Sequence, residues 1–160
     1  MRRIDQLLIE YGASHKNDTN KTIHWICVPV IFFSIVGLIW SIPSGPLKGI
    51  EAGSLTPYVN WATIILLLVS VYYFSLSVPL AIGMLIFGAI CLFLCNLLES
   101  ILPMPLWMFS IGIFILAWIG QFIGHNIEGK KPSFLKDLQF LLIGPAWLMH
   151  FIYKKLNISY

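Results

Sequence analysis

Four histidines are the residues of this sequence whose type and placement point most clearly to chemistry. They are His15, His24, His125 and His150. The imidazole ring is the commonest metal ligand in proteins near neutral pH. One such histidine is more often a packed core residue, but several that converge beside long apolar stretches favour a functional site, because ionisable groups are costly there. The sequence predicts a site for one metal ion, provided that the chain brings the histidines together.

The first two histidines need a turn between them if they are to bind the same ion. His15 and His24 are nine residues apart, which on one helix amounts to about 900° and places them on opposite faces. The sequence Asn-Asp-Thr-Asn between them is turn-rich, and its Thr19 or Asn20 is suited to cap a following helix. We therefore expect His15 to fold back over a helix that begins near Lys21.

The third histidine shares a helix face with two other polar residues. Gln121, His125 and Glu128 are spaced i, i+4 and i+7. Glu128 could complete a metal site of two histidines and one carboxylate, or accept a hydrogen bond from an imidazole N–H. It could equally be a solvated charge beside Lys130 and Lys131. The sequence leaves these three interpretations open.

Membrane-spanning helices are the elements expected to position these residues. Hydrophobic residues make up 58% of the 160 residues and charged residues 11%, against about 45–50% and about 25% in soluble domains. This composition excludes a disordered chain. A net charge of only +3 argues against a nucleic-acid binder, and three cysteines exclude a disulfide scaffold. We expect an all-α, polytopic membrane protein that forms a single integral membrane domain over residues 1–160.

Stretches without Lys, Arg, Asp or Glu locate four expected spans. These stretches cover residues 22–47, 52–98 and 100–127. About 20 apolar residues cross the hydrocarbon core, so the middle stretch holds two spans, with a break before Pro79. The predicted spans are 24–42, 57–76, 79–98 and 105–127.

Two further segments are expected at the membrane surface. Residues 2–12 carry one apolar stripe that includes Ile4 and Leu8, which predicts an interfacial helix. Residues 133–153 contain charges and a break at Gly144–Pro145, which favours two interfacial or re-entrant half-helices. A kinked fifth span is the alternative.

The basic residues predict how the chain crosses the membrane. With four spans, nine of the ten Lys and Arg residues lie on one side and only Lys48 lies on the other. The positive-inside rule then places both termini in the cytoplasm, either at the cytoplasmic membrane of a bacterium or at the endoplasmic reticulum of a eukaryote. This topology, obtained without using the histidines, brings all four of them to one membrane face.

The remaining motifs carry less information about function. Gly120 and Gly124 form a G-x-x-x-G pair, which permits close contact between helices. Cys27, Cys91 and Cys95 are interpreted as small apolar side chains. The sequence has no Walker loop, no G-x-S-x-G and no H-E-x-x-H, and four histidines are too few for a membrane di-iron site.

Two blocks of residues carry a resemblance to a known family. The first block is His15-x8-His24, with Tyr11, Asn17 and Asn20 around it and Val28–Pro29 after it. The second block is Gln121-Phe122-x-Gly124-His125, followed by Glu128, Pro132 and Pro145. With these blocks the chain resembles the 2-hydroxy fatty acid dioxygenase family, whose fungal member acts in phytosphingosine breakdown at the endoplasmic reticulum.

The resemblance implies an iron(II)-dependent dioxygenase. Such an enzyme oxidises a 2-hydroxy fatty acid with O2 and shortens it by one carbon, an α-oxidation in lipid and sphingoid-base catabolism. The resemblance also implies that His15, His24 and His125 are the catalytic metal ligands. The family pattern has a carboxylate where this chain has Phe151, so the neighbouring His150 is either a replacement ligand or a bystander.

The chemistry implied by the resemblance is consistent with the residues. Three imidazoles would leave positions on iron(II) for the carboxylate and hydroxyl of a 2-hydroxy acid and for O2. The substrate head would reach the metal at the membrane–cytosol boundary while the acyl chain stays among the helices. Lys130 and Lys131 could attract the carboxylate or simply mark the topology. The residues expected to support the ligands or the substrate are Tyr11, Asn20, Gln121, Glu128 and Lys131.

Three other functions agree with parts of the sequence. His24 and His125 could ligate a haem between two spans in an electron-transfer protein. Histidines could relay protons in a transporter, although the expected spans lack charges at mid-membrane. The chain could also be an assembly protein without a metal. Nucleic acid is not an expected partner, and the oligomeric state stays open.

Overall fold

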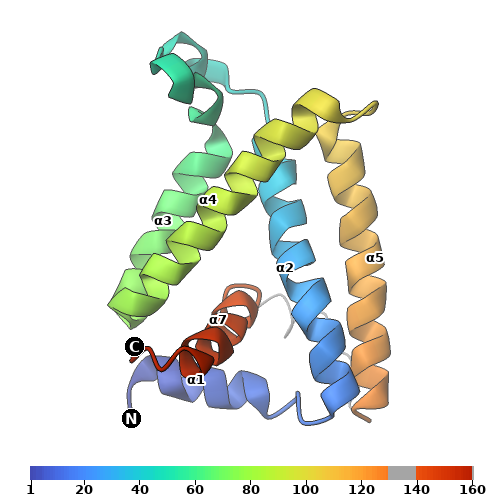
Figure 1. Ribbon diagram of the computed structural model, residues 1–160. Helices are drawn as coiled ribbons and strands as arrows, with labels where there is room; N and C mark the ends of the chain where they lie inside the picture. Colours follow the sequence, from blue (N-terminus) through green and yellow to red (C-terminus); the bar gives the residue numbers. More distant parts are fainter. Residues whose placement is uncertain (130–139, 160) are drawn as a thin grey trace.

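The computed structural model describes residues 1–129 and 140–159, and the described residues form helices and no strand. This confirms the predicted all-α fold. Figure 1 shows a long pair, α2 and α5, beside a second pair, α3 and α4, with the short helices α1 and α7 across one end. The elements are α1 (Arg3–Gly12), α2 (Asp18–Trp40), η1 (Gly45–Gly49), η2 (Gly53–Tyr58), α3 (Trp61–Leu76), α4 (Val78–Ile101), α5 (Leu106–Ile127) and α7 (Ile143–Lys155).

Three helices in the described part of the chain are long and apolar enough to cross a membrane. These are α2, α4 and α5, with 23, 24 and 22 residues. The apolar helix α3 has 16 residues, and at 1.5 Å per residue it measures about 24 Å, less than the roughly 30 Å hydrocarbon core. It is shorter than the predicted span 57–76 because Asn60 caps its first turn, where its side chain accepts a hydrogen bond from Thr63 N. A fourth span therefore stays a prediction.

Helix α2 begins six residues before the predicted span, and the reason is its cap. The side chain of Asn17 accepts hydrogen bonds from the backbone N–H groups of Thr19 and Asn20, so Asn17 is the cap and the predicted caps Thr19 and Asn20 lie in the first turn of the helix instead. The predicted turn after His15 is nevertheless present. The early start of α2 places His24 in its second turn.

The pair α3–α4 forms where the sequence predicts a break. Ser77 alone separates the two helices, in an extended conformation, and Pro79 lies in the first turn of α4, where its missing N–H is tolerated. Helix α4 then continues three residues beyond the predicted end at residue 98.

Helix α7 corrects the prediction for residues 133–153. The part of that range before residue 140 lies outside the described residues. In the described part, Gly144–Pro145 does not break a helix but lies in the first turn of α7, where proline is compatible with the backbone. With 13 residues α7 measures about 20 Å, too short to be a span by itself.

Two tyrosines of the α3–α4 pair and of α7 hold these elements together. Tyr73 Oη donates a hydrogen bond of 2.6 Å to the Leu142 carbonyl, just before α7. Near the other end of α7, Tyr153 Oη donates one of 2.6 Å to the Pro79 carbonyl. Helix α7 also packs against α1. The buried residues of α1, Ile4, Leu8 and Tyr11, belong to the predicted apolar stripe.

Small residues bring α2 and α5 together, as the G-x-x-x-G pair predicts. A Cβ added to Gly120 would lie 2.7 Å from Cys27 Sγ, and one added to Gly124 would collide with Asn20 Oδ1. Both glycines therefore face α2, and the two antiparallel backbones approach closely at the end that carries His24 and His125.

Candidate metal centre

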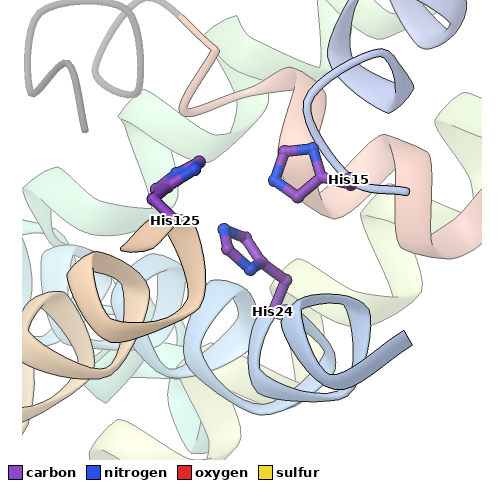
Figure 2. A group of neighbouring side chains, drawn as sticks. All are labelled: His15, His24 and His125. Atoms are coloured by element: carbon purple, nitrogen blue, oxygen red, sulfur yellow. The ribbon is translucent and has the colours of Figure 1, made fainter. Parts of the chain in front are cut away.

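Three of the four histidines meet at one end of the helices, as Figure 2 shows. His15 follows α1, His24 lies in the second turn of α2, and His125 lies in the last turn of α5. All three are buried, and one potential ligand atom from each lies within 4.8 Å of the others. Their ring centroids are 4.3 Å (His15–His24), 5.0 Å (His24–His125) and 5.5 Å (His15–His125) apart. We call these residues the histidine triad.

Backbone carbonyls orient two rings of the triad. His15 Nδ1 lies 2.7 Å from the Tyr11 carbonyl and His24 Nδ1 lies 2.9 Å from the Asn20 carbonyl, each four residues earlier. A carbonyl oxygen only accepts, so both Nδ1 atoms carry a proton, and in the neutral ring the Nε2 atom then holds the lone pair. Metal-binding histidines in proteins commonly donate their other ring N–H in this way.

The donor set fits a single metal ion that prefers nitrogen ligands. Nitrogens bound to one metal at about 2.1 Å lie about 3 to 3.5 Å apart. The ligand atoms of the triad lie within 4.8 Å of one another, so they would need to approach one another only slightly to bind an ion. A haem between His24 and His125 does not fit, because the His15 ring packs against both of them and occupies the space that the porphyrin would need.

Aromatic side chains from α1 and α7 form one wall of the triad. The Tyr11 ring stacks on His15 with centroids 4.4 Å apart and an angle of 17°. The centroid of the Trp147 ring lies 5.3 Å from that of Tyr11 and 5.3 Å from that of His15. Trp147 is a site residue that the sequence analysis missed, since nothing in the spacing of α7 distinguishes it from other buried aromatics.

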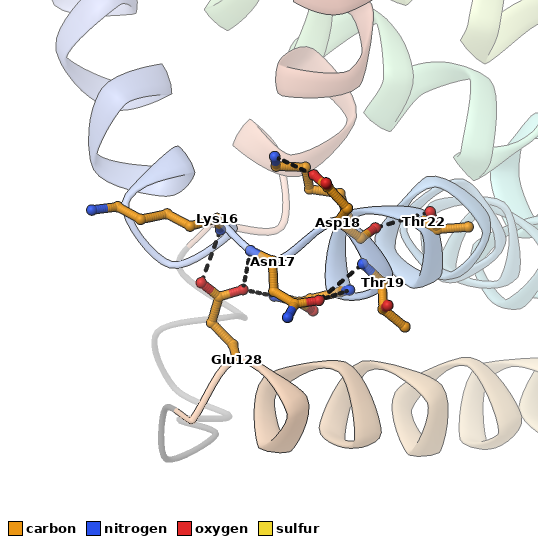
Figure 3. Close-up of polar contacts among 8 residues, drawn as sticks. Lys16, Asn17, Asp18, Thr19, Thr22 and Glu128 are labelled. Carbon is orange, nitrogen blue, oxygen red and sulfur yellow. Dashed lines mark hydrogen bonds and ion pairs between the residues drawn. The ribbon is translucent and has the colours of Figure 1, made fainter.

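Glu128, just after α5, forms hydrogen bonds with the segment that follows His15, as Figure 3 shows. Its carboxylate accepts hydrogen bonds from Lys16 N (2.9 Å), Asn17 N (2.9 Å) and Asn20 Nδ2 (3.0 Å). Partial burial acts to raise the pKa of Glu128, but the hydrogen bonds from Asn17, Asn20 and Lys16 outweigh it and lower the pKa to about 2. In the structure the carboxylate thus binds backbone and Asn20 donors and positions the segment that follows His15.

Comparison with known proteins places the chain in a family. The family model described as "2-hydroxy-palmitic acid dioxygenase Mpo1-like" matches residues 1–156. The chain belongs to the Mpo1-like family. It is 30% identical over 148 residues to the protein named 2-hydroxy-palmitic acid dioxygenase MPO1 of Saccharomyces cerevisiae, a match that covers 90% of this chain and 76% of the yeast protein. No solved structure matches the chain.

Asn20 supports the centre of this Mpo1-like chain through its neighbours. It is fully buried, and its Nδ2 donates to the Ser14 carbonyl (3.2 Å) as well as to Glu128. Its Oδ1 lies against Gly124. The side chain therefore bridges α5, α2 and the turn that carries His15.

Gln121 lies one turn before His125 on α5, towards the middle of that helix. Its buried side chain lines a small cavity of about 20 Å³ together with Tyr11 and Val28. This volume is enough for about one water molecule. Gln121 and Tyr11 thus line the same small cavity.

His150 does not join the triad, contrary to the expectation that it could be a fourth ligand. Helix α7 presents Trp147 to His15, and His150 lies one turn further along, where it lines a cavity of about 250 Å³ with Asp5, Leu8 and Trp147 itself. Burial and the charge of Lys154 lower its pKa, and Asp5 opposes them. Lys131, expected near the substrate, lies outside the described residues.

Proposed function

We propose that this chain is a non-haem, iron(II)-dependent dioxygenase that oxidises 2-hydroxy fatty acids with O2 and shortens them by one carbon. The observation that carries the proposal is the triad itself: three buried imidazoles from distant segments, two of them held as ligand-competent tautomers. Membership of the Mpo1-like family supports the substrate class, because the yeast relative is named for 2-hydroxy-palmitic acid.

In the proposed reaction the protein would bind the metal, orient the acid and limit the access of water. His15, His24 and His125 would hold the metal. Iron(II), when bound, would supply the one-electron chemistry that lets O2 react with a spin-paired organic acid. Gln121 and Tyr11, which line one small cavity, would receive the polar head of the acid. The aromatic wall of Tyr11 and Trp147 limits the access of water from the polar side.

The overall reaction balances without another reactant. A 2-hydroxy acid and O2 together contain the atoms of a fatty acid one carbon shorter, carbon dioxide and water. The substrate gives up four electrons and O2 accepts four. The proposed enzyme therefore needs no separate reductant and no second redox cofactor.

Metal analysis tests the proposal most directly. Protein purified in detergent without oxygen should contain about one iron per chain by mass spectrometry and show no haem absorption band. His24→Ala and His125→Ala should lose the iron, while His150→Ala, the matched control, should keep it. Activity on 2-hydroxypalmitate should follow the iron content. A well-folded wild-type protein that takes up no transition metal would refute the proposal.

A further inference from the structure

Two rows of side chains lead from the triad along α2 and α5. On α2, the residues at i+4, i+7 and i+11 from His24 lie on the same helix face as His24. Helix α5 runs antiparallel to α2, and its residues at i−4, i−7 and i−11 from His125 lie on the same face as His125. We call these two rows the α2–α5 seam. Its members are Val28, Ile31 and Ile35 of α2 with Gln121, Trp118 and Phe114 of α5.

The seam becomes less polar with distance from the triad. Val28, Ile31, Trp118 and Gln121 line the cavity of about 20 Å³, and Gln121 lies one helical turn from His125 on α5. Ile31 and Trp118 then belong to one buried apolar cluster. Ile35 and Phe114, which pack at the edge of that cluster, are only partly buried. A ligand with a polar head and an alkyl tail matches this order.

Two larger apolar cavities of the described structure do not lead from the triad. One, of about 390 Å³, is lined by Pro29, Val30 and Phe33 of α2. Phe33 is nine residues from His24, which places it on the opposite face of α2. The other, of about 180 Å³, lies between α3 and α4 and is reached from α2 only at Phe32. Neither of these two cavities therefore continues the rows of side chains that start at His24 and His125.

We propose that the α2–α5 seam holds the alkyl chain of the 2-hydroxy fatty acid and determines which chain lengths are accepted. This inference rests on the proposed function. From His24 to Ile35 the seam rises about 16 Å along α2, a distance suited to a long alkyl chain. The small cavity beside Gln121 marks its start. Leu141, just before α7, packs against the cluster and lines the cavity, so an alkyl chain in the seam would displace its side chain.

A chain-length series tests the proposal. Ile31→Phe adds volume in the middle of the seam, while Leu116→Phe adds the same ring at a position that is 68% exposed on another face of α5. For Ile31→Phe we expect kcat/KM on 2-hydroxystearate to fall by about tenfold or more, with little change on 2-hydroxyoctanoate. Leu116→Phe should keep the wild-type profile. Equal losses on both acids in Ile31→Phe, at unchanged iron content, would overturn the proposal.

A binding measurement separates this inference from the proposed function. A 2-hydroxystearate that carries bromine at the middle of its chain should quench the fluorescence of Trp118 in iron-free protein, and Trp118→Phe should remove that part of the quenching. Quenching in a protein that oxidises no 2-hydroxy acid would support the seam and refute the dioxygenase. Normal oxidation with no quenching attributable to Trp118 would refute the seam and leave the dioxygenase standing.

Discussion

At the scale of single residues, the centre depends on the groups that hold the imidazoles as much as on the imidazoles. The carbonyls of Tyr11 and Asn20 set the tautomers of His15 and His24, and both lie four residues before the ring they orient. The Tyr11 ring also stacks on His15. Because His15 lies outside a regular helix, it relies on these contacts more than His24 and His125 do.

Tyr11 provides a test of this dependence. Tyr11→Phe keeps the stacked ring and should leave the iron affinity close to that of the wild type. Tyr11→Ala removes the ring and should lower the iron affinity by about tenfold or more, because supporting groups of a metal ligand commonly have effects of that size. Titration of iron(II) into metal-free protein would measure both. Equal affinity in the two variants would show that the stack does not position His15.

Glu128 predicts a pH dependence of stability. Its pKa in the folded protein is about 2, below the ordinary value of 4.5, so the charged form is stabilised by folding. This contribution is present above about pH 4.5 and is lost as the pH falls towards 2. Glu128→Gln should melt at a lower temperature than the wild type at neutral pH, and the difference should shrink as the pH falls from 5 towards 2.

Thermal melting in detergent across this pH range would measure the effect. Glu10→Gln, at an exposed position of α1, is the matched control and should melt as the wild type does throughout. A difference between Glu128→Gln and wild type that does not vary with pH would show that the carboxylate charge is not the cause.

At the scale of elements, the site depends on how closely α2 and α5 approach. Gly120 and Gly124 face α2, and the second of them contacts Asn20 and His24. Helix α7 contributes from the other side, because the hydrogen bonds of Tyr73 and Tyr153 hold it against the α3–α4 pair. The triad therefore joins elements that are distant in sequence.

Gly124→Ala tests the close approach. The added Cβ would collide with Asn20 Oδ1 and lie 3.3 Å from His24 Cε1, so the helices must separate. We expect a destabilisation of about 1–3 kcal/mol together with loss of iron. Gly112→Ala, on the same helix with no neighbouring atom within 4 Å of the new Cβ, should be neutral or stabilising. Thermal melting and iron content would measure both variants, and a Gly124→Ala protein with full iron content would contradict the expectation.

At the scale of the whole molecule, the triad lies at the end of the spans that also carries both chain ends. Figure 1 places the N- and C-termini, α1 and α7 at this end, and η1 and η2 at the other. That both termini share one side of a membrane stays a prediction. Their assignment to the cytoplasm stays a prediction from the basic residues.

Cysteine labelling in intact cells or oriented membranes would test this assignment. The three native cysteines are buried, so they should react slowly. Ser159→Cys, near the C-terminus, should react with an impermeant maleimide only from the cytoplasmic side, and Lys48→Cys, in η1, only from the opposite side. Labelling of both positions from the same side would contradict the four-span topology.

The sequence by itself determined the elements and the ligand candidates. Long charge-free stretches with a proline break predict helices correctly, because a backbone in lipid must satisfy its own hydrogen bonds. The cluster of His15, His24 and His125 could be anticipated because the helix ends that carry them fall on one predicted membrane face. The spacing of Gly120 and Gly124 likewise predicts the close contact with α2.

Only the tertiary structure decided which polar groups serve the centre. His150 and Trp147 lie one turn apart on α7, and the packing of α7 on α1 presents the tryptophan to His15 and leaves the histidine in a cavity that none of the triad lines. Glu128 meets Lys16 and Asn17 across more than a hundred residues of sequence. Such contacts depend on the relative position of separate helices, which local spacing does not specify, since each helix can rotate and slide until side-chain packing fixes it.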